Sequence, residues 1–258
     1  MPRLVILERV CRRWRQECWK AVENLTVVSK RSASLLAKCK RLKYLQLINV
    51  PVDTLEAVTH LTHLIQLYVK QGFNSRLLHN LIHLKHLRAL SLVKCDDLTP
   101  YRLARDISAF IHVTSLNLAH TPITNHVIES IAVLTRLRQL SFGFRSGNTN
   151  FSPSTEIATL SNLTNLRLLY CHSVEFQQSL IYLTALRSIE NLLLKACSSL
   201  NFDATNVGLV CTRLTHIQFK YCTQGMSYNR IYLKITLIIM VYLVNRENVE
   251  KLGLDPIH

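Results

Sequence analysis

The hexapeptide LKYLQL at residues 42–47 has leucines at its first, fourth and sixth positions, and this spacing decides the fold. The same apolar-x-x-apolar-x-apolar pattern returns seven more times, at intervals of 22 to 26 residues. Its further occurrences are LIQLYV at 64–69, LRALSL at 87–92, VTSLNL at 113–118, LRQLSF at 137–142, LTNLRL at 163–168, IENLLL at 189–194 and LTHIQF at 214–219. A period held over so much of the chain indicates a structural repeat.

Each repeat predicts one short strand followed by a helical connection. Apolar residues alternate within the hexapeptide, as in a strand with one buried face. The stretch 124–134 (TNHVIESIAVL) instead places Val127, Ile128 and Ile131 at helical spacing. One such unit cannot bury its own apolar face, whereas a stack of units forms a continuous core. The sequence therefore predicts an α/β solenoid, with parallel strands on the concave face and helices or 3-10 turns on the convex face. The period and strand pattern match leucine-rich repeats.

Cysteines recur at fixed places in the repeats. Two of them, Cys39 and Cys211, stand three residues before a hexapeptide, and four follow the first hexapeptide residue by eight positions, namely Cys95, Cys171, Cys197 and Cys222. The segment VCTRLTHIQFKYC at 210–222 resembles the cysteine-containing subfamily of leucine-rich repeats. Such regular placement favours small buried thiols over disulfides. Together with an N-terminus that does not read as a secretory signal, it predicts a reducing compartment, cytoplasmic and/or nuclear.

Positive charge is concentrated in the first part of the chain. The formal net charge is +15, and residues 1–43 contribute +9 of it. Residues 4–20 (LVILERVCRRWRQECWK) show an apolar stripe at helical spacing between arginines, which predicts an amphipathic helix. Such a helix is consistent with a cap for the solenoid end, or with a basic helix for nucleic acid or a membrane surface.

A third interpretation of the head rests on a resemblance. The string LVILERVCRRWRQECW resembles the second half of an F-box, whose hallmark is a V-C-R-x-W segment followed by a later Trp. The Leu-Pro start and first helix of that motif have no counterpart here. The resemblance implies docking to a Skp-type adaptor within a cullin–RING ubiquitin ligase complex. The implied adaptor-binding residues are Leu7, Val10, Cys11, Trp14 and Trp19.

The expected ligand surface is the concave face, where the positions between the buried leucines point outward. Positions three, five, seven and eight of the eight repeats include no Asp or Glu. A neutral-to-positive surface with aromatic anchors favours a protein substrate that is acidic or phosphorylated; the alternative is that strands simply disfavour acidic residues. The candidate substrate-binding residues are Tyr44, Tyr68, Lys70, Arg167, Tyr170, Lys195, Lys220 and Tyr221.

No pattern in the sequence predicts catalysis, a cofactor or a metal site. His79, His83 and His86 share one helical face, but they fall at ordinary solvated positions and lack the converging ligands that a metal needs. The apolar run at 231–244 is shorter than a membrane-spanning helix and rich in β-branched residues, so a membrane partner is not expected. Nucleic acid is not expected as a partner either.

The sequence thus predicts three regions and one main function. Residues 1–36 form a partial F-box-like helical head and cap, 37–225 the solenoid, and 226–258 an irregular C-terminal repeat. The predicted function is that of a non-catalytic substrate-recognition subunit of a Skp–cullin–F-box ubiquitin ligase. The alternative is an intracellular scaffold or inhibitor that acts by protein binding alone.

Overall fold

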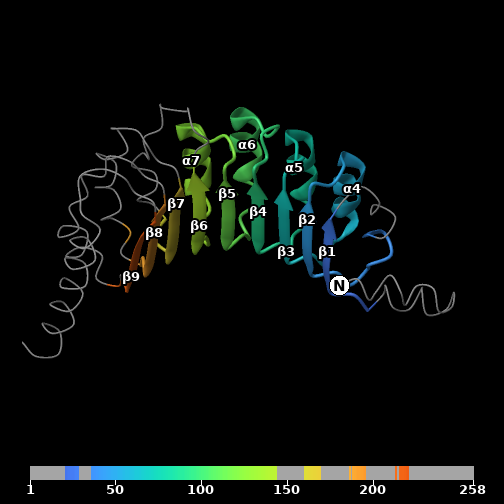
Figure 1. Cartoon of the computed structure of the whole chain (residues 1–258), viewed down its shortest axis with the longest axis horizontal. Helices are drawn as coiled ribbons and strands as arrows, with labels where there is room; N and C mark the ends of the chain where they lie inside the picture. Colours follow the sequence, from blue (N-terminus) through green and yellow to red (C-terminus); the bar gives the residue numbers. More distant parts are fainter. Residues whose placement is uncertain are drawn as a thin grey trace, which may run out of the picture.

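The computed structural model describes residues 21–28, 36–143, 160–169, 186, 188–195, 213 and 215–220. They contain a sheet of nine parallel strands that follow one another in chain order (Figure 1). The strands are β1 (Asn24–Val28), β2 (Tyr44–Ile48), β3 (Gln66–Lys70), β4 (Ala89–Val93), β5 (Ser115–Ala119), β6 (Gln139–Gly143), β7 (Asn165–Leu169), β8 (Asn191–Lys195) and β9 (His216–Lys220). Each of the eight hexapeptides supplies one strand, β2 to β9, which confirms the predicted α/β solenoid.

Helices connect the strands from β2 to β6 and form a second layer beside the sheet (Figure 1). They are α4 (Val52–Glu56), the 3-10 helix η1 (Ala57–His60), α5 (Ser75–Leu81), α6 (Pro100–Ile107) and α7 (Asn125–Ala132). The predicted apolar face of the 124–134 stretch is confirmed, because Val127, Ile128 and Ile131 of α7 are fully buried. At the start of α5, the Asn74 side chain accepts hydrogen bonds from two backbone amides and so satisfies the free end of the helix.

The sheet begins one strand earlier than the sequence analysis places it. β1 lies inside the region expected to be a helical head and cap, and it pairs with β2 in parallel register. Its segment VENLTV at 22–27 has the repeat pattern with valines at the first and last apolar positions. Val22, Leu25 and Val27 are all buried against the core. The step of 20 residues to the next hexapeptide is shorter than the others, which hid this repeat from the period search.

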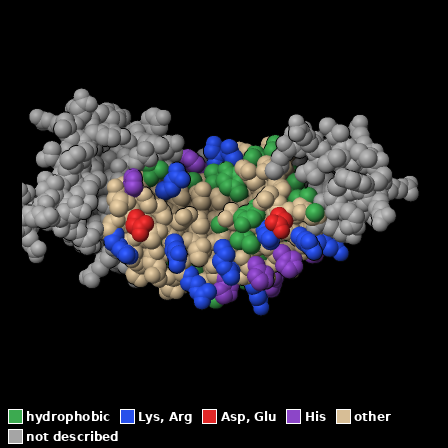
Figure 2. Space-filling view, turned by 90° about the horizontal axis from the view of Figure 1, so that it is seen from below, with side chains coloured by type: hydrophobic (Ala, Val, Ile, Leu, Met, Phe, Trp, Pro, Cys, Tyr) green, Lys and Arg blue, Asp and Glu red, His purple; other side chains and the backbone are tan. Residues whose placement is uncertain are grey.

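The strands pair without stagger, so equivalent positions of successive repeats stand side by side. Tyr44 pairs with Gln66, and Gln66 pairs with Ala89; the same relation continues to His216 of β9. Neighbouring strands in a sheet are about 4.8 Å apart. Because all strands are parallel, the turns that precede them gather at one edge of the sheet, which Figure 2 views directly.

Backbone hydrogen bonds fix the two ends of each strand. At the start, the amides of Ile65 and Gln66 both donate to the Lys43 carbonyl, at 2.8 and 2.9 Å, and the same double bond recurs in later repeats. Just past the end, a residue adopts a left-handed conformation and its amide donates to the next strand. These residues are Asn49, Gln71, Lys94 and His120, with φ between 50° and 70°. This conformation is uncommon outside Gly and Asn.

The cysteine position of the repeat fills the turn beneath this left-handed residue. Cys95 is fully buried, and Thr121 occupies the same place one repeat later, where its hydroxyl donates to the Leu92 carbonyl at 2.7 Å. Gly72 occupies it one repeat earlier with φ 77°, and an added Cβ would lie 3.1 Å from the Val50 carbonyl.

The structure confirms buried thiols at Cys39 and Cys95. Burial raises the pKa of Cys39 to about 11 and that of Cys95 to about 12, so both stay protonated at neutral pH. Such thiols pack as small apolar groups and are poor nucleophiles. The other repeat cysteines lie outside the described residues, as do residues 4–20 and the C-terminal region 226–258.

Candidate functional site

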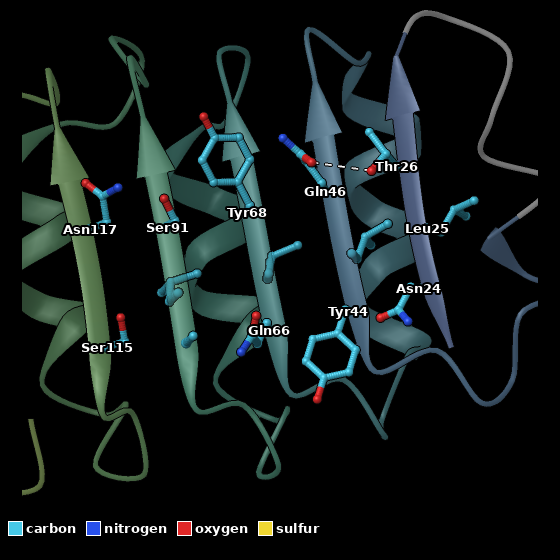
Figure 3. A pocket seen from close by; sticks show the side chains of 14 residues that line it. Asn24, Leu25, Thr26, Tyr44, Gln46, Gln66, Tyr68, Ser91, Ser115 and Asn117 are labelled. Atoms are coloured by element: carbon cyan, nitrogen blue, oxygen red, sulfur yellow. Dashed lines mark hydrogen bonds between the residues drawn. The ribbon is translucent and has the colours of Figure 1, made fainter. Parts of the chain in front are cut away.

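A groove of about 450 Å³ lies on the face of the sheet that carries no helices, across β1 to β5 (Figure 3). We call it the concave groove. Its floor is formed by strand backbone, and the side chains that stand on it come from the first and third residues of each strand. Its polar lining residues are Asn24, Thr26, Tyr44, Gln46, Gln66, Tyr68, Ser91, Ser115 and Asn117.

Every polar side chain of the groove is a neutral hydrogen-bonding group. Thr26 donates to the Gln46 side-chain carbonyl at 3.3 Å, which joins β1 to β2. The Ser91 hydroxyl is shielded from solvent and has no hydrogen-bond partner in the described part of the chain. A shielded hydroxyl without a partner costs free energy, so a ligand that reaches this point gains by bonding to it.

Two tyrosines supply the largest side chains of the groove. Tyr44 on β2 is 39% exposed, and Tyr68 on the neighbouring β3 is half-buried. Figure 3 shows the Tyr68 hydroxyl toward the C-terminal ends of the strands and the Tyr44 hydroxyl toward their N-terminal ends. The rings therefore bracket the groove along the strand direction and leave amides and hydroxyls between them.

Comparisons with known proteins identify the architecture. No protein-family model matches the sequence, and no curated protein matches it. Among solved structures, internalin C2 from Listeria monocytogenes str. 4b F2365 matches with a TM-score of 0.57 at 19% identity, over 79% of this chain and 83% of that chain. The fold is a leucine-rich-repeat solenoid.

Two further solved leucine-rich-repeat structures match at lower scores. Internalin inlF from the same strain gives a TM-score of 0.36 at 16% identity, over 85% of this chain and 88% of that one. The leucine-rich-repeat ectodomain of the Arabidopsis receptor kinase HAESA, solved with an N-terminal extended IDA peptide hormone ligand, gives 0.46 at 16% identity, over 80% and 34%.

The leucine-rich-repeat solenoid separates the predicted substrate-binding residues. Tyr44 and Tyr68 line the concave groove, whereas Lys70 ends β3 and does not line it. Arg167 is exposed on β7, two strands beyond the groove. Lys195 and Lys220 end β8 and β9 with side chains that are not described, and Tyr170 and Tyr221 lie outside the described residues. The adaptor-binding candidates Leu7, Val10, Cys11, Trp14 and Trp19 also lie outside them.

The groove differs in charge from the concave face expected from sequence. No lining residue is acidic, as expected, but none is basic either. Sequence reasoning also missed the contribution of Asn24 and Thr26, because β1 was not recognised as a strand. Their signal was present in VENLTV at 22–27, one short period before the first hexapeptide.

The predicted histidine positions have other roles in the leucine-rich-repeat solenoid. His79 lies 3.3 Å from a carboxylate oxygen of Asp106 in the next repeat, while His86 stacks on His63 with ring centroids 6.3 Å apart. No group of three or more potential metal ligands converges within the described ranges. Among the helices that are described, none is both long and apolar enough to cross a membrane.

Proposed function

We propose that this chain is the substrate-recognition subunit of a Skp–cullin–F-box type ubiquitin ligase and that it binds its protein substrate in the concave groove. The observation that carries the binding half is the groove itself, in which two tyrosines flank shielded hydrogen-bonding groups. Residues 10–19 carry the ligase half through their resemblance to an F-box.

The groove has the chemistry of a protein-binding surface. Tyrosine is enriched at binding hot spots because one ring supplies both apolar area and a hydroxyl. The amides of Gln46, Gln66 and Asn117 can donate to and accept from a polypeptide backbone. The proposed role needs no catalytic residue or cofactor, because the chain would only hold its substrate near a ubiquitin-charged enzyme. It would act in the cytoplasm and/or nucleus.

Replacement of Trp14 tests the ligase half. We expect Trp14→Ala to remove co-purification of the Skp-type adaptor, because an aromatic anchor in a helical docking segment contributes a large share of the binding energy. The measurement is quantitative recovery of adaptor and cullin with the full chain. Arg13→Ala, at the variable position of V-C-R-x-W, is the matched control and should retain the adaptor. Equal recovery with Trp14→Ala and wild type would refute adaptor docking and leave the scaffold or inhibitor alternative.

Replacement of the groove tyrosines tests the binding half. We expect Tyr44→Ala/Tyr68→Ala to lower recovery of the substrate at least tenfold, since hot-spot aromatics each contribute about 2 kcal/mol or more. Tyr101→Ala is the matched control, because Tyr101 is 80% exposed on the helical side. Proteins lost with the double variant but kept with the control are groove ligands, and their ubiquitination should depend on Trp14. An unchanged set of bound proteins would exclude the groove as the substrate site.

A further inference from the structure

The edge of the sheet where the strands begin carries a row of basic side chains. Three positions of each repeat face this edge: the two residues before the hexapeptide and its second residue. Figure 2 looks onto it and shows Lys, Arg and His side chains along its length, with few acidic ones. We call the positions of the five repeats from β2 to β6 the basic edge; its basic members are Lys40, Arg41, Lys43, His63, Lys85, His86, Arg88, His112, Arg136 and Arg138.

The charge on the basic edge is segregated rather than average. Its 15 positions hold seven of the 13 Lys and Arg in the 108 residues from 36 to 143, and none of the six acids of that stretch. Those acids fall instead in the helices or in the turns that follow the strands, as Asp96, Asp97 and Glu129 do. A solvated surface without a partner has no need for such an uneven distribution, and a row of one sign produces a field that attracts the opposite sign.

The fold holds these cations in line and leaves them available. The double hydrogen bonds at each strand start fix the backbone of the second hexapeptide residue, so Lys43, Arg88 and Arg138 stand on alternate strands, about 10 Å apart. Arg88 is steadied by bonds from its guanidinium to the carbonyls of Lys85 and Leu87 at 2.9 and 3.2 Å. Within the described part of the chain, Lys43 is the one member of the row with a carboxylate partner, Glu23 at 2.9 Å.

We propose that the basic edge docks an acidic, Asp/Glu-rich segment of a protein partner. The edge spans four strand spacings, or about 19 Å, which an extended segment covers with about six residues. Spreading the cations over five repeats fits several carboxylates better than one phosphate group, which a compact cluster of arginines would hold. The edge has no aromatic side chain among its 15 positions, whereas sites for single-stranded nucleic acid combine basic grooves with aromatic rings on which bases stack.

The edge is also continuous with the concave groove. Tyr44, Gln66 and Ser115 are the first residues of their strands and directly follow edge positions. A protein seated in the groove would therefore bring its own rim onto the edge. The inference that both surfaces bind one substrate rests on the proposed function; the acidic-segment site does not.

The test measures binding of a fluorescein-labelled octaglutamate peptide to the full chain by anisotropy at low salt, about 20 mM. We expect Arg41→Gln/Arg136→Gln/Arg138→Gln to weaken binding roughly tenfold, since exposed ion pairs each contribute modestly. Arg76→Gln/Lys94→Gln/Arg102→Gln removes the same charge elsewhere and should change binding less than twofold. Glutamine is tolerated at position 94 because Gln71 has the same left-handed conformation. Raising the salt to about 150 mM should weaken the wild type.

Three results would overturn the proposal: equal weakening by both triple variants, binding of octaglutamine as tight as that of octaglutamate, or tighter edge-dependent binding of an RNA duplex of matched charge. The last would assign the edge to nucleic acid. Thermal melts of both variants exclude a folding defect. Because the readout involves neither adaptor nor substrate, its failure is distinct from failure of the ligase proposal, which the Trp14 and tyrosine variants report.

Discussion

Phe73→Ala should lower the free energy of unfolding by about 4 kcal/mol, the largest effect we expect from a single substitution. Phe73 is 1% exposed and is among the largest fully buried side chains described. It lies between the end of β3 and the start of α5, and its backbone amide bonds to the Cys95 sulfur of the next repeat. Removing the ring leaves a cavity at a junction between two repeats, where fixed strands and turns prevent collapse. Since a domain is stable by only about 5–15 kcal/mol, the loss is severe.

Urea denaturation followed by circular dichroism measures this loss. The matched control is again Tyr101→Ala, which removes an aromatic ring of similar size from an 80% exposed site and should change stability by less than about 0.5 kcal/mol. A loss below about 1 kcal/mol for Phe73→Ala would contradict the tight inter-repeat packing described above.

Asp106→Asn should lower the free energy of unfolding by about 2 kcal/mol. Asp106 is buried in α6 with a side chain only 3% exposed. Its carboxylate accepts two bonds from Arg105, at 2.8 and 2.9 Å, and lies 3.3 Å from the His79 ring nitrogen in α5. Both partners are more than half exposed, so solvent screening keeps the effect below that of a fully buried ion pair. An amide of the same shape loses the charge and presents a donor toward the Arg105 donors.

The contribution of Asp106 should also depend on pH. Burial alone would raise the pKa of this carboxyl, but the bonds from Arg105 and His79 outweigh it and hold the pKa below 3.8. A group whose pKa is lower in the folded than in the unfolded state binds its proton more readily when unfolded. Its stabilisation is therefore complete above about pH 5 and is lost as the pH falls below 4.

The measurement is the difference in unfolding free energy between wild type and Asp106→Asn as a function of pH. We expect a constant difference from about pH 5 upward and a shrinking one below pH 4. Comparing the two proteins cancels the titration of the other carboxyls. A difference that grows on acidification would show that the Asp106 pKa is raised, and the ion pair would then not be the source of its stability.

The sequence alone determined the solenoid, because the apolar pattern of each strand is local and repeats along the chain. Leu90 and Leu92 must be buried on one face, and so must their counterparts in every other hexapeptide, whatever the connecting segments do. It also determined that Tyr44 and Tyr68 face outward on neighbouring strands, since side chains alternate along a strand. The same local logic explains the missed strand β1: VENLTV obeys the pattern, but its valines and short spacing weaken the signal until packing against β2 is seen.

Only the tertiary structure decided which surfaces these residues build. Ser91 has a shielded, unpartnered hydroxyl because of the side chains on β3 and β5, about 23 to 26 residues away in the chain. Lys94 adopts a left-handed conformation because its amide must reach the Ala119 carbonyl of the next strand. The charges of Arg88 and Arg138 form one row only because their strands are parallel and unstaggered. Burial preference is a property of each residue, whereas register, shielding and the addition of charges depend on neighbours that only folding brings together.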